Sequence, residues 1–279
     1  MSMNTIRESD YQFIRNLVYE QSRISLGNDK KELVQARVNK RLRQLQIGTY
    51  SEYCRFLKAP EGKDELDSLV DVLTTNFTSF FRENRHFEFL RDSVLSKCTA
   101  SNNGSRSKSF RIWSAACSTG EEPYTIAIVL AEFFSKLDGW DWQLDATDIS
   151  SRVLAKAQLG VYDAERVTLP DRTCLRRYFQ RGVRANEGSY RIKNDLKARI
   201  HFQQINLFQP DYPIDFELDA IFCRNVMIYF DQPTQELLVN RLTEYLKPGG
   251  HLFVGHSESF IGIKHSLRGL VPSVYQRPE

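Results

Sequence analysis

Apolar residues recur at helical spacing through the first 75 or so residues of the chain. The stretches DYQFIRNLVYEQS (residues 10–22) and DELDSLVDVLTTN (64–76) both place apolar side chains three and four positions apart, the pattern of an amphipathic helix. Between them, Gly48 is a stop signal for one helix, and Thr49 to Glu52 fit a capping box for the next. The pattern predicts a small all-helical domain over residues 1–75.

From residue 110 onward, short β-prone segments alternate with helical ones. The β-prone segments are RIWSAAC, WQLDATD, ARIHFQQIN, LDAIFCRN, GGHLFVGH and SVYQR, and helical patterns run to about 136, over about 150–159 and over about 233–246. Alternation of this kind is typical of a mostly parallel sheet with helices on both faces. We therefore predict an α/β domain over residues 110–279.

Two segments do not fit this alternation. Residues of about 175–200 contain short β-prone pieces around NEGS, which predict an inserted small antiparallel β subdomain. Residues 76–109 end in the polar tract TASNNGSRSKS, typical of a surface loop, and are predicted to be a linker segment that includes a ligand-contacting stretch.

Composition and charge exclude several classes of protein. The 279 residues are 41% hydrophobic and 26% charged, with a net charge of +3, which gives no global case for nucleic-acid binding. No stretch has the apolar core of a signal peptide or the length of a membrane span, so we expect a cytoplasmic protein without membrane insertion. The five cysteines are scattered, the five histidines lack metal-ligand spacing, and we expect reduced thiols and no metal.

The stretch FRIWSAACSTGEEPYTIAIVL (110–130) predicts a strand, a loop of small residues and a helix. In α/β proteins, this arrangement brings a nucleotide close to the backbone at the carboxyl end of the strand. Here, however, Glu121 and Glu122 stand where a phosphate would lie, and no lysine follows to bind one. The loop therefore favours a nucleoside ligand that carries no pyrophosphate.

An acid at the end of the next predicted strand supports a nucleoside ligand. Asp148 ends the next predicted strand, about 28 residues after Gly120, where doubly wound folds place the carboxylate that binds both ribose hydroxyls. Glu122 at the helix start would suit an ammonium group; alternatively it only complements the helix dipole, worth about 0.3–1 kcal/mol. S-adenosylmethionine meets every constraint, because it has an adenosine, an α-ammonium and a sulfonium but no phosphate.

Three more stretches carry polar residues at informative places. TNFTSFFRE (75–83) interleaves them with phenylalanines, which in isolation is more often a core-facing segment than a site. IFCRNVMIYFD (221–231) and QINLF (204–208) follow buried strands, so their polar residues are expected on the ligand side of the sheet. Tyr229 fits either a core aromatic or a site hydroxyl.

Five blocks together identify a family resemblance. TNFTSFFRE, WSAACSTGEEPYTIA, ATDIS, IFCRNVMIYFD and LKPGGHLFVGHSE, in this order and across nearly the whole chain, resemble the CheR family of chemotaxis receptor methyltransferases. The resemblance implies a Rossmann-like methyltransferase sheet. It also implies that the protein transfers a methyl group from S-adenosylmethionine to glutamate side chains on the cytoplasmic helices of chemoreceptors.

The resemblance also implies roles for individual residues. Arg82 and Tyr229 would stand nearest the transferring methyl group. The implied cofactor-binding residues are Asn76, Thr78, Arg82, Glu122, Asp148, Asn206, Leu207, Asn225 and Val226. A glutamate carboxylate is already ionised at neutral pH, so methyl transfer to it needs alignment rather than a general base. This explains why no catalytic histidine is implied.

Two segments are candidates for receptor binding. The predicted helix 29–46 carries six basic and two acidic residues, with Lys30, Arg37 and Arg41 on one side of its apolar stripe. Charge runs of this kind are usually solvated faces, but in the family the helical domain recognises acidic receptor helices. Arg181 and Gly182, in the insertion, could present a sheet edge to a receptor tail peptide, or only blunt that edge against aggregation.

Two rival functions remain open from the sequence. A nucleic-acid methyltransferase would share the cofactor domain, but no base-stacking aromatics accompany a broad basic surface. A sensor that binds the cofactor without transferring methyl is disfavoured by the presence of both Arg82 and Tyr229.

Overall fold

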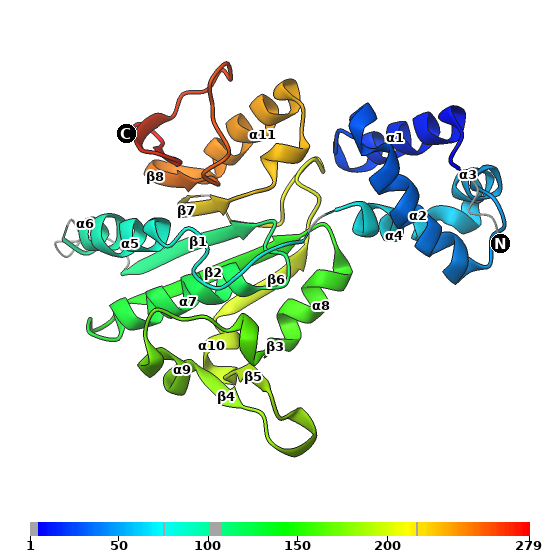
Figure 1. Ribbon diagram of the computed structural model, residues 1–279. Helices are drawn as coiled ribbons and strands as arrows, with labels where there is room; N and C mark the ends of the chain where they lie inside the picture. The colour runs from blue at the N-terminus through cyan, green and yellow to red at the C-terminus, as the bar shows by residue number, and fades with distance from the viewer. Residues whose placement is uncertain (1–4, 75, 101–107, 216) are drawn as a thin grey trace. The chain divides into compact units, whose positions relative to one another are not determined.

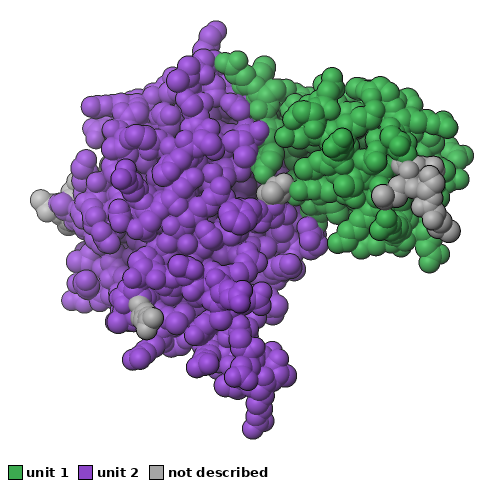
Figure 2. Space-filling view, in the orientation of Figure 1, with its two compact units in different colours: residues 1–75, 229–234 green, residues 76–228, 235–279 purple. Residues whose placement is uncertain are grey.

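The computed structural model describes residues 5–74, 76–100, 108–215 and 217–279. The chain forms two compact units, shown in green and purple in Figure 2. The first consists of Met1–Thr75 with Tyr229–Thr234, and the second of Asn76–Ile228 with Gln235–Glu279. The division after residue 75 coincides with the end of the predicted helical domain. Residues 229–234 also group with that domain, which no local pattern predicted.

Within residues 5–74, the regular elements of the first unit are all helices, as predicted. Its helices are α1 (Glu8–Ser22), α2 (Lys31–Leu45), α3 (Tyr50–Lys58) and α4 (Lys63–Leu73), with 3-10 turns η1 (Asn28–Lys30) and η2 (Pro60–Gly62). Apolar side chains from the helices form its core: Tyr11, Ile14, Val34, Val38, Tyr53 and Leu69. The capping box is confirmed, because Thr49 Oγ1 accepts from the Glu52 amide at 3.2 Å and the Glu52 carboxylate accepts from the Thr49 amide at 3.0 Å.

A seven-stranded sheet forms the centre of the second unit (Figure 1). Its strands, in sheet order, are β6 (Ile200–Gln204), β2 (Asp141–Asp148), β1 (Ser109–Ala115), β7 (Leu218–Cys223), β8 (Leu246–Phe253), β10 (Val274–Gln276) and β9 (Arg268–Val271). The strands from β6 to β8 pair in parallel, and β10 and β9 continue the sheet antiparallel. The prediction of a mostly parallel sheet is confirmed, whereas β9 was not predicted.

Helices cover both faces of this sheet. Side chains alternate between the faces along a strand, so Phe110 and Trp113 of β1 point in opposite directions. Phe110 packs against Phe134 of α7 (Glu121–Phe134), with ring centroids 6.1 Å apart. Trp113 contacts Tyr245 of α11 (Gln232–Tyr245) at 6.2 Å. A third helix, α8 (Ser151–Leu159), follows β2 along the chain.

The inserted subdomain is present but begins earlier than predicted. Its antiparallel sheet has the order β3 (Val161–Asp163), β5 (Ser189–Ile192), β4 (Phe179–Arg181), and lies at the bottom of the view in Figure 1. It also includes η4 (Ala164–Arg166), α9 (Arg172–Tyr178), η5 (Arg184–Asn186) and α10 (Asn194–Lys197). The predicted start near 175 is wrong, because β3 is only three residues long and so carries too little periodicity to register.

The linker prediction for residues 76–109 is wrong over its central part. Residues 85–100 form α5 (Arg85–Phe89), a π-helical turn η3 (Leu90–Leu95) and α6 (Ser96–Ala100). Phe87, Leu90 and Leu95 are buried in the core that also contains α7. Because these side chains lie in that core, the segment is part of the α/β unit. Residues 101–107 of the predicted polar loop lie outside the described residues.

Candidate active site

In the loop after β1, every second residue from 116 to 120 has a left-handed backbone conformation. Ala116, Ser118 and Gly120 have φ values of 62°, 50° and 97°. Alanine and serine adopt this conformation only at a cost of about 1–3 kcal/mol, and such strain concentrates at ligand sites held in place by their surroundings. The loop predicted to receive the cofactor therefore has a defined backbone that neighbouring groups must stabilise.

Asp148 is one of those neighbouring groups. Its Oδ2 accepts a hydrogen bond from the Ser118 amide at 2.9 Å, and its Oδ1 accepts one from the Ser150 amide at 2.9 Å. The carboxylate thus joins the carboxyl ends of β1 and β2. Each oxygen has further lone pairs, so binding ribose hydroxyls as well is chemically compatible with this arrangement.

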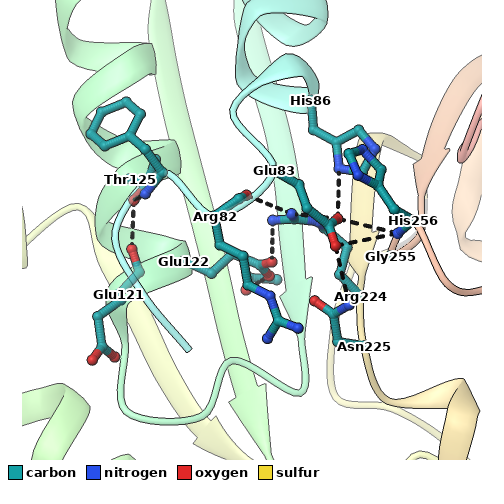
Figure 3. A network of polar contacts seen from close by, with 12 residues as sticks. Arg82, Glu83, His86, Glu121, Glu122, Thr125, Arg224, Asn225, Gly255 and His256 are labelled. Carbon is teal, nitrogen blue, oxygen red and sulfur yellow. Dashed lines mark hydrogen bonds and ion pairs between the residues drawn. The ribbon is translucent and has the colours of Figure 1, made fainter. Parts of the chain in front are cut away.

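The two adjacent acids at the start of α7 point their side chains in opposite directions (Figure 3). Glu122 accepts from Ser114 Oγ at 2.7 Å and from Arg224 Nη1 at 3.0 Å. Glu121, which is fully buried, accepts from Thr119 Oγ1 and from Arg166 Nη2, both at 2.6 Å. Burial raises the pKa of both carboxyl groups, and the neighbouring arginines counteract it.

Arg224 is the centre of a buried polar network (Figure 3). Its guanidinium is 1% exposed and binds Glu122, the Glu83 Oε2 at 2.8 Å and the Arg82 carbonyl oxygen at 2.6 Å. Two carboxylates therefore share one guanidinium, which leaves one negative charge in excess. Arg224 follows directly after β7, where a polar residue was expected on the ligand side, but its pairing with Glu83 was not predicted.

Glu83 stays ionised although it is largely buried. Burial is the largest single influence on the pKa of Glu83 and raises it. Hydrogen bonds from Arg224 and Asn225, together with the Arg224 charge, outweigh the effect of burial, so the net result is a lowered pKa. Beside it, His86 is 2% exposed, and burial together with the Arg224 charge lowers its pKa to about 3. The histidine is therefore neutral at physiological pH and does not cancel the excess negative charge.

Three potential metal ligands meet in this network. Atoms of Glu83, His86 and His256 that could bind a metal lie within 4.8 Å of one another, which histidine spacing in the sequence did not indicate. The Glu83 carboxylate is already paired with the Arg224 guanidinium at 2.8 Å. The expectation of no metal stays a prediction.

A further buried acid organises the residues after β7. Glu258 accepts hydrogen bonds from the backbone amides of Asn225 at 2.8 Å, Met227 at 2.7 Å and Gly255 at 2.5 Å. These bonds hold Asn225 at a φ of 58° and fix the position of Val226 between the bonded amides. Sequence reasoning missed Glu258, although it is the last residue of the block LKPGGHLFVGHSE.

The predicted cofactor stretch 76–83 is attached to the β1 loop and to α7. Ser118 Oγ donates to the Asn76 carbonyl at 3.4 Å, and the Phe81 amide donates to Thr125 Oγ1 of α7 at 3.2 Å. Arg82 Nη1 donates to the Phe77 carbonyl at 2.7 Å, and its half-buried side chain extends away from His86 (Figure 3). Thr78 lies half-buried within the same stretch.

Asn206 and Leu207 follow β6, as expected for residues at the carboxyl edge of the sheet. Asn206 Oδ1 accepts from the Phe208 amide at 3.0 Å, and the Leu207 carbonyl accepts from the Tyr212 hydroxyl. Tyr229 belongs to the first unit, where its carbonyl accepts from the Ser25 amide at 2.8 Å. Roles of these three residues at the cofactor or the methyl acceptor stay predictions.

The candidate receptor-binding arginines of α2 have partners inside their own unit. Arg37 donates to the Leu73 and Thr74 carbonyls at 2.7 and 2.9 Å, and Arg41 forms a two-pronged ion pair with the buried Glu65. Lys30 is exposed in η1. In the insertion, Arg181 is exposed on β4 and Gly182 donates its amide to the Ser189 carbonyl at 2.8 Å.

Comparison with known proteins identifies the family. Residues 76–273 match the model described as "CheR methyltransferase, SAM binding domain", and residues 9–74 match "CheR methyltransferase, all-alpha domain". Chemotaxis protein methyltransferase 2 of Pseudomonas aeruginosa is 43% identical over 95% of this chain and 92% of its own. The chemotaxis protein methyltransferase of Escherichia coli is 39% identical over 95% of this chain and 90% of its own. The chain therefore belongs to the CheR family of chemotaxis protein methyltransferases, which use S-adenosylmethionine to methylate receptor glutamates.

Proposed function

We propose that the Glu83–Arg224–Glu122 network is the part of this methyltransferase that selects a cationic cofactor. The observation that carries the proposal is the sharing of one buried guanidinium by two carboxylates, with the neutral His86 beside them. The excess negative charge fits the α-ammonium and sulfonium groups of S-adenosylmethionine and repels a pyrophosphate. Glu122 would bind the ammonium, and Asp148 the ribose hydroxyls.

The remaining cofactor-binding residues are proposed from their places around the network. Asn76 and Thr78 lie on the stretch attached to the β1 loop, and Asn225 and Val226 lie on the turn that Glu258 holds. Asn206 and Leu207 would flank the adenine beyond β6. The bound cofactor supplies an electrophilic methyl group on a sulfonium, which makes general-base catalysis unnecessary for a carboxylate acceptor.

The protein's contribution to the methyl transfer is positioning and partial exclusion of water. Arg82 would orient the acceptor carboxylate through its guanidinium, and Tyr229 would donate a hydrogen bond to the same group. Correct alignment of two reactants can contribute roughly 7–11 kcal/mol to lowering a barrier. Because the Arg82 carbonyl is fixed by Arg224, the same network that binds the cofactor also fixes the backbone of the acceptor-binding residue.

The receptor substrate is proposed to contact both the helical unit and the insertion. Lys30, Arg37 and Arg41 would face acidic receptor helices, and the internal bonds of Arg37 and Arg41 leave Lys30 as the most exposed of the three. Strand β4 is an edge strand of the small sheet, so Arg181 and Gly182 lie where an extended receptor tail could add a strand. We propose the cytoplasm as the location, since the receptor helices to be methylated are cytoplasmic. None of the described helices has the length and hydropathy of a membrane span.

Replacing Glu122 with glutamine tests the ammonium assignment. We expect binding of S-adenosylhomocysteine, measured by calorimetry, to weaken about 10- to 100-fold, because hydrogen bonds to charged groups contribute roughly 1.5–3 kcal/mol. Glu132→Gln, near the other end of α7, is the matched control and should bind like the wild type. Equal affinity of Glu122→Gln and the wild type would contradict the assignment.

The affinity should also depend on pH in a defined direction. Burial raises the pKa of Glu122 above 4.5 in the free protein. Because the ammonium binds only the ionised carboxylate, lowering the pH protonates Glu122 and weakens S-adenosylhomocysteine binding, beginning above the usual titration range of glutamate. Calorimetry between pH 4.5 and 7.5 should show this loss for the wild type and a flatter profile for Glu122→Gln; parallel profiles would refute the role of this carboxyl group.

A further inference from the structure

The inserted subdomain makes direct polar contact with the β1 loop. Tyr162 of β3 is buried, and its hydroxyl donates to the Thr119 carbonyl at 2.7 Å. Arg166 of η4 donates to Glu121 at 2.6 Å, and Glu121 in turn accepts from the Thr119 side chain. Thr119 of the loop and Glu121, the first residue of α7, are therefore held from the insertion.

The close packing at Gly120 adds to these contacts. A Cβ atom at this position would lie 2.8 Å from the Tyr162 hydroxyl and 2.9 Å from the Ala157 Cβ of α8. The loop backbone at Gly120 has a φ of 97°, which strongly favours glycine. The insertion thus packs closely against the loop at Gly120, where the backbone conformation of the loop strongly favours glycine.

The other cofactor stretch also rests on the insertion. Phe80, which lies between Thr78 and Arg82, is 4% exposed. Its ring packs edge-on against Tyr162 at 5.0 Å and against Phe179 of β4 at 5.5 Å. Edge-to-face aromatic pairs of this kind are directional, so a shift of the small sheet would be transmitted to the stretch that carries Arg82.

We propose that the inserted β subdomain is a positioning element of the cofactor site, with Arg166 acting through Glu121 and Tyr162 acting through Thr119 to hold the Ala116–Gly120 loop in its binding conformation. The inference rests on the cofactor site proposed above. Arg166 is half-exposed whereas Glu121 is fully buried, so removal of Arg166 leaves a buried carboxylate without its cationic partner. The energetic cost of this unpaired buried charge is reduced by movement of the loop or by protonation of the carboxylate.

The test is S-adenosylhomocysteine calorimetry on the full chain at neutral pH. We expect Arg166→Ala to bind about tenfold more weakly than the wild type, and Arg166→Lys to recover part of the loss. The double variant Glu121→Gln, Arg166→Ala should recover most of it, because no unpaired carboxylate remains. Arg177→Ala is the control, because Arg177 of α9 also joins the insertion to α7, through Glu132 at 2.6 Å, but near the other end of that helix.

Each outcome decides one point. Absence of binding by the wild type itself would overturn the cofactor site and this inference with it. Wild-type affinity in Arg166→Ala would overturn the inference alone. Equally weakened binding in Arg166→Ala and Arg177→Ala, with matched losses of melting temperature, would show general destabilisation and overturn the inference. Failure of the double variant to recover binding would also overturn the inference.

Discussion

Arg82→Ala is expected to lower methyl transfer to receptors at least about 100-fold, with the fold unchanged. Misplacement of a reactant by about 1 Å can lower the reaction rate about 100-fold, and Arg82 is the proposed orienting group for the acceptor carboxylate. Within the described part of the chain, its guanidinium donates to the Phe77 carbonyl and lies over the Phe77 ring at 5.6 Å. The Arg82 carbonyl that binds Arg224 is retained in alanine, so the buried network survives.

Initial rates with labelled cofactor and receptor-containing membranes measure this effect. The matched control is Arg85→Ala, an exposed arginine at the start of α5 that should keep wild-type activity. Calorimetry with S-adenosylhomocysteine and thermal unfolding show whether the cofactor site and the fold are intact. Undiminished methyl transfer by Arg82→Ala would remove Arg82 from the mechanism.

Arg224→Met is expected to destabilise the second unit by about 3–5 kcal/mol. Removing one partner of a buried ion pair leaves an uncompensated charge, and here Glu83 and Glu122 both lose their guanidinium. The pKa of both carboxyl groups should then rise, because Arg224 lowers each of them in the wild type. Protonation relieves the unpaired charges, so the destabilisation should shrink as the pH falls towards their raised pKa values.

Urea unfolding at neutral and acidic pH measures both the loss and its pH dependence. Arg91→Met is the control: Arg91 pairs with Asp92 on the surface, with side chains 54% and 60% exposed, and should change stability by less than about 1 kcal/mol. A loss for Arg224→Met no larger than that of the control would show that the network is not held by this guanidinium.

Local patterns in the sequence predicted the elements that are long and strongly periodic. The helices of the first unit and the parallel strands show their apolar face at every turn or every second residue, so their type could be inferred without tertiary contacts. Strands β3 and β9, with three and four residues, carry too little pattern for this. The helix that begins at Arg85 was not predicted, because the polar tract at 99–109 is typical of a surface loop and the whole segment was interpreted as a linker.

The site was predicted in part, for reasons that depend on geometry. Glu122 and Asp148 could be predicted as site residues because their places follow from the order of strand, loop and helix. Adjacent positions on a helix differ by about 100° in direction, so only the structure shows that Glu121 turns to Arg166 and Glu122 to Arg224. Glu83 meets its partners across more than a hundred residues of chain, and no local signal marks such a contact.

The most direct test of the account is transfer of a tritiated methyl group from S-adenosylmethionine to receptor-containing membranes, followed by alkaline treatment. A carboxylate acceptor gives a methyl ester, which hydroxide cleaves to release the label as volatile methanol. We predict labelled receptor, release of the label in base, and inhibition by S-adenosylhomocysteine. Receptor that stays unlabelled, or label that resists base, would contradict methylation of glutamate by this protein.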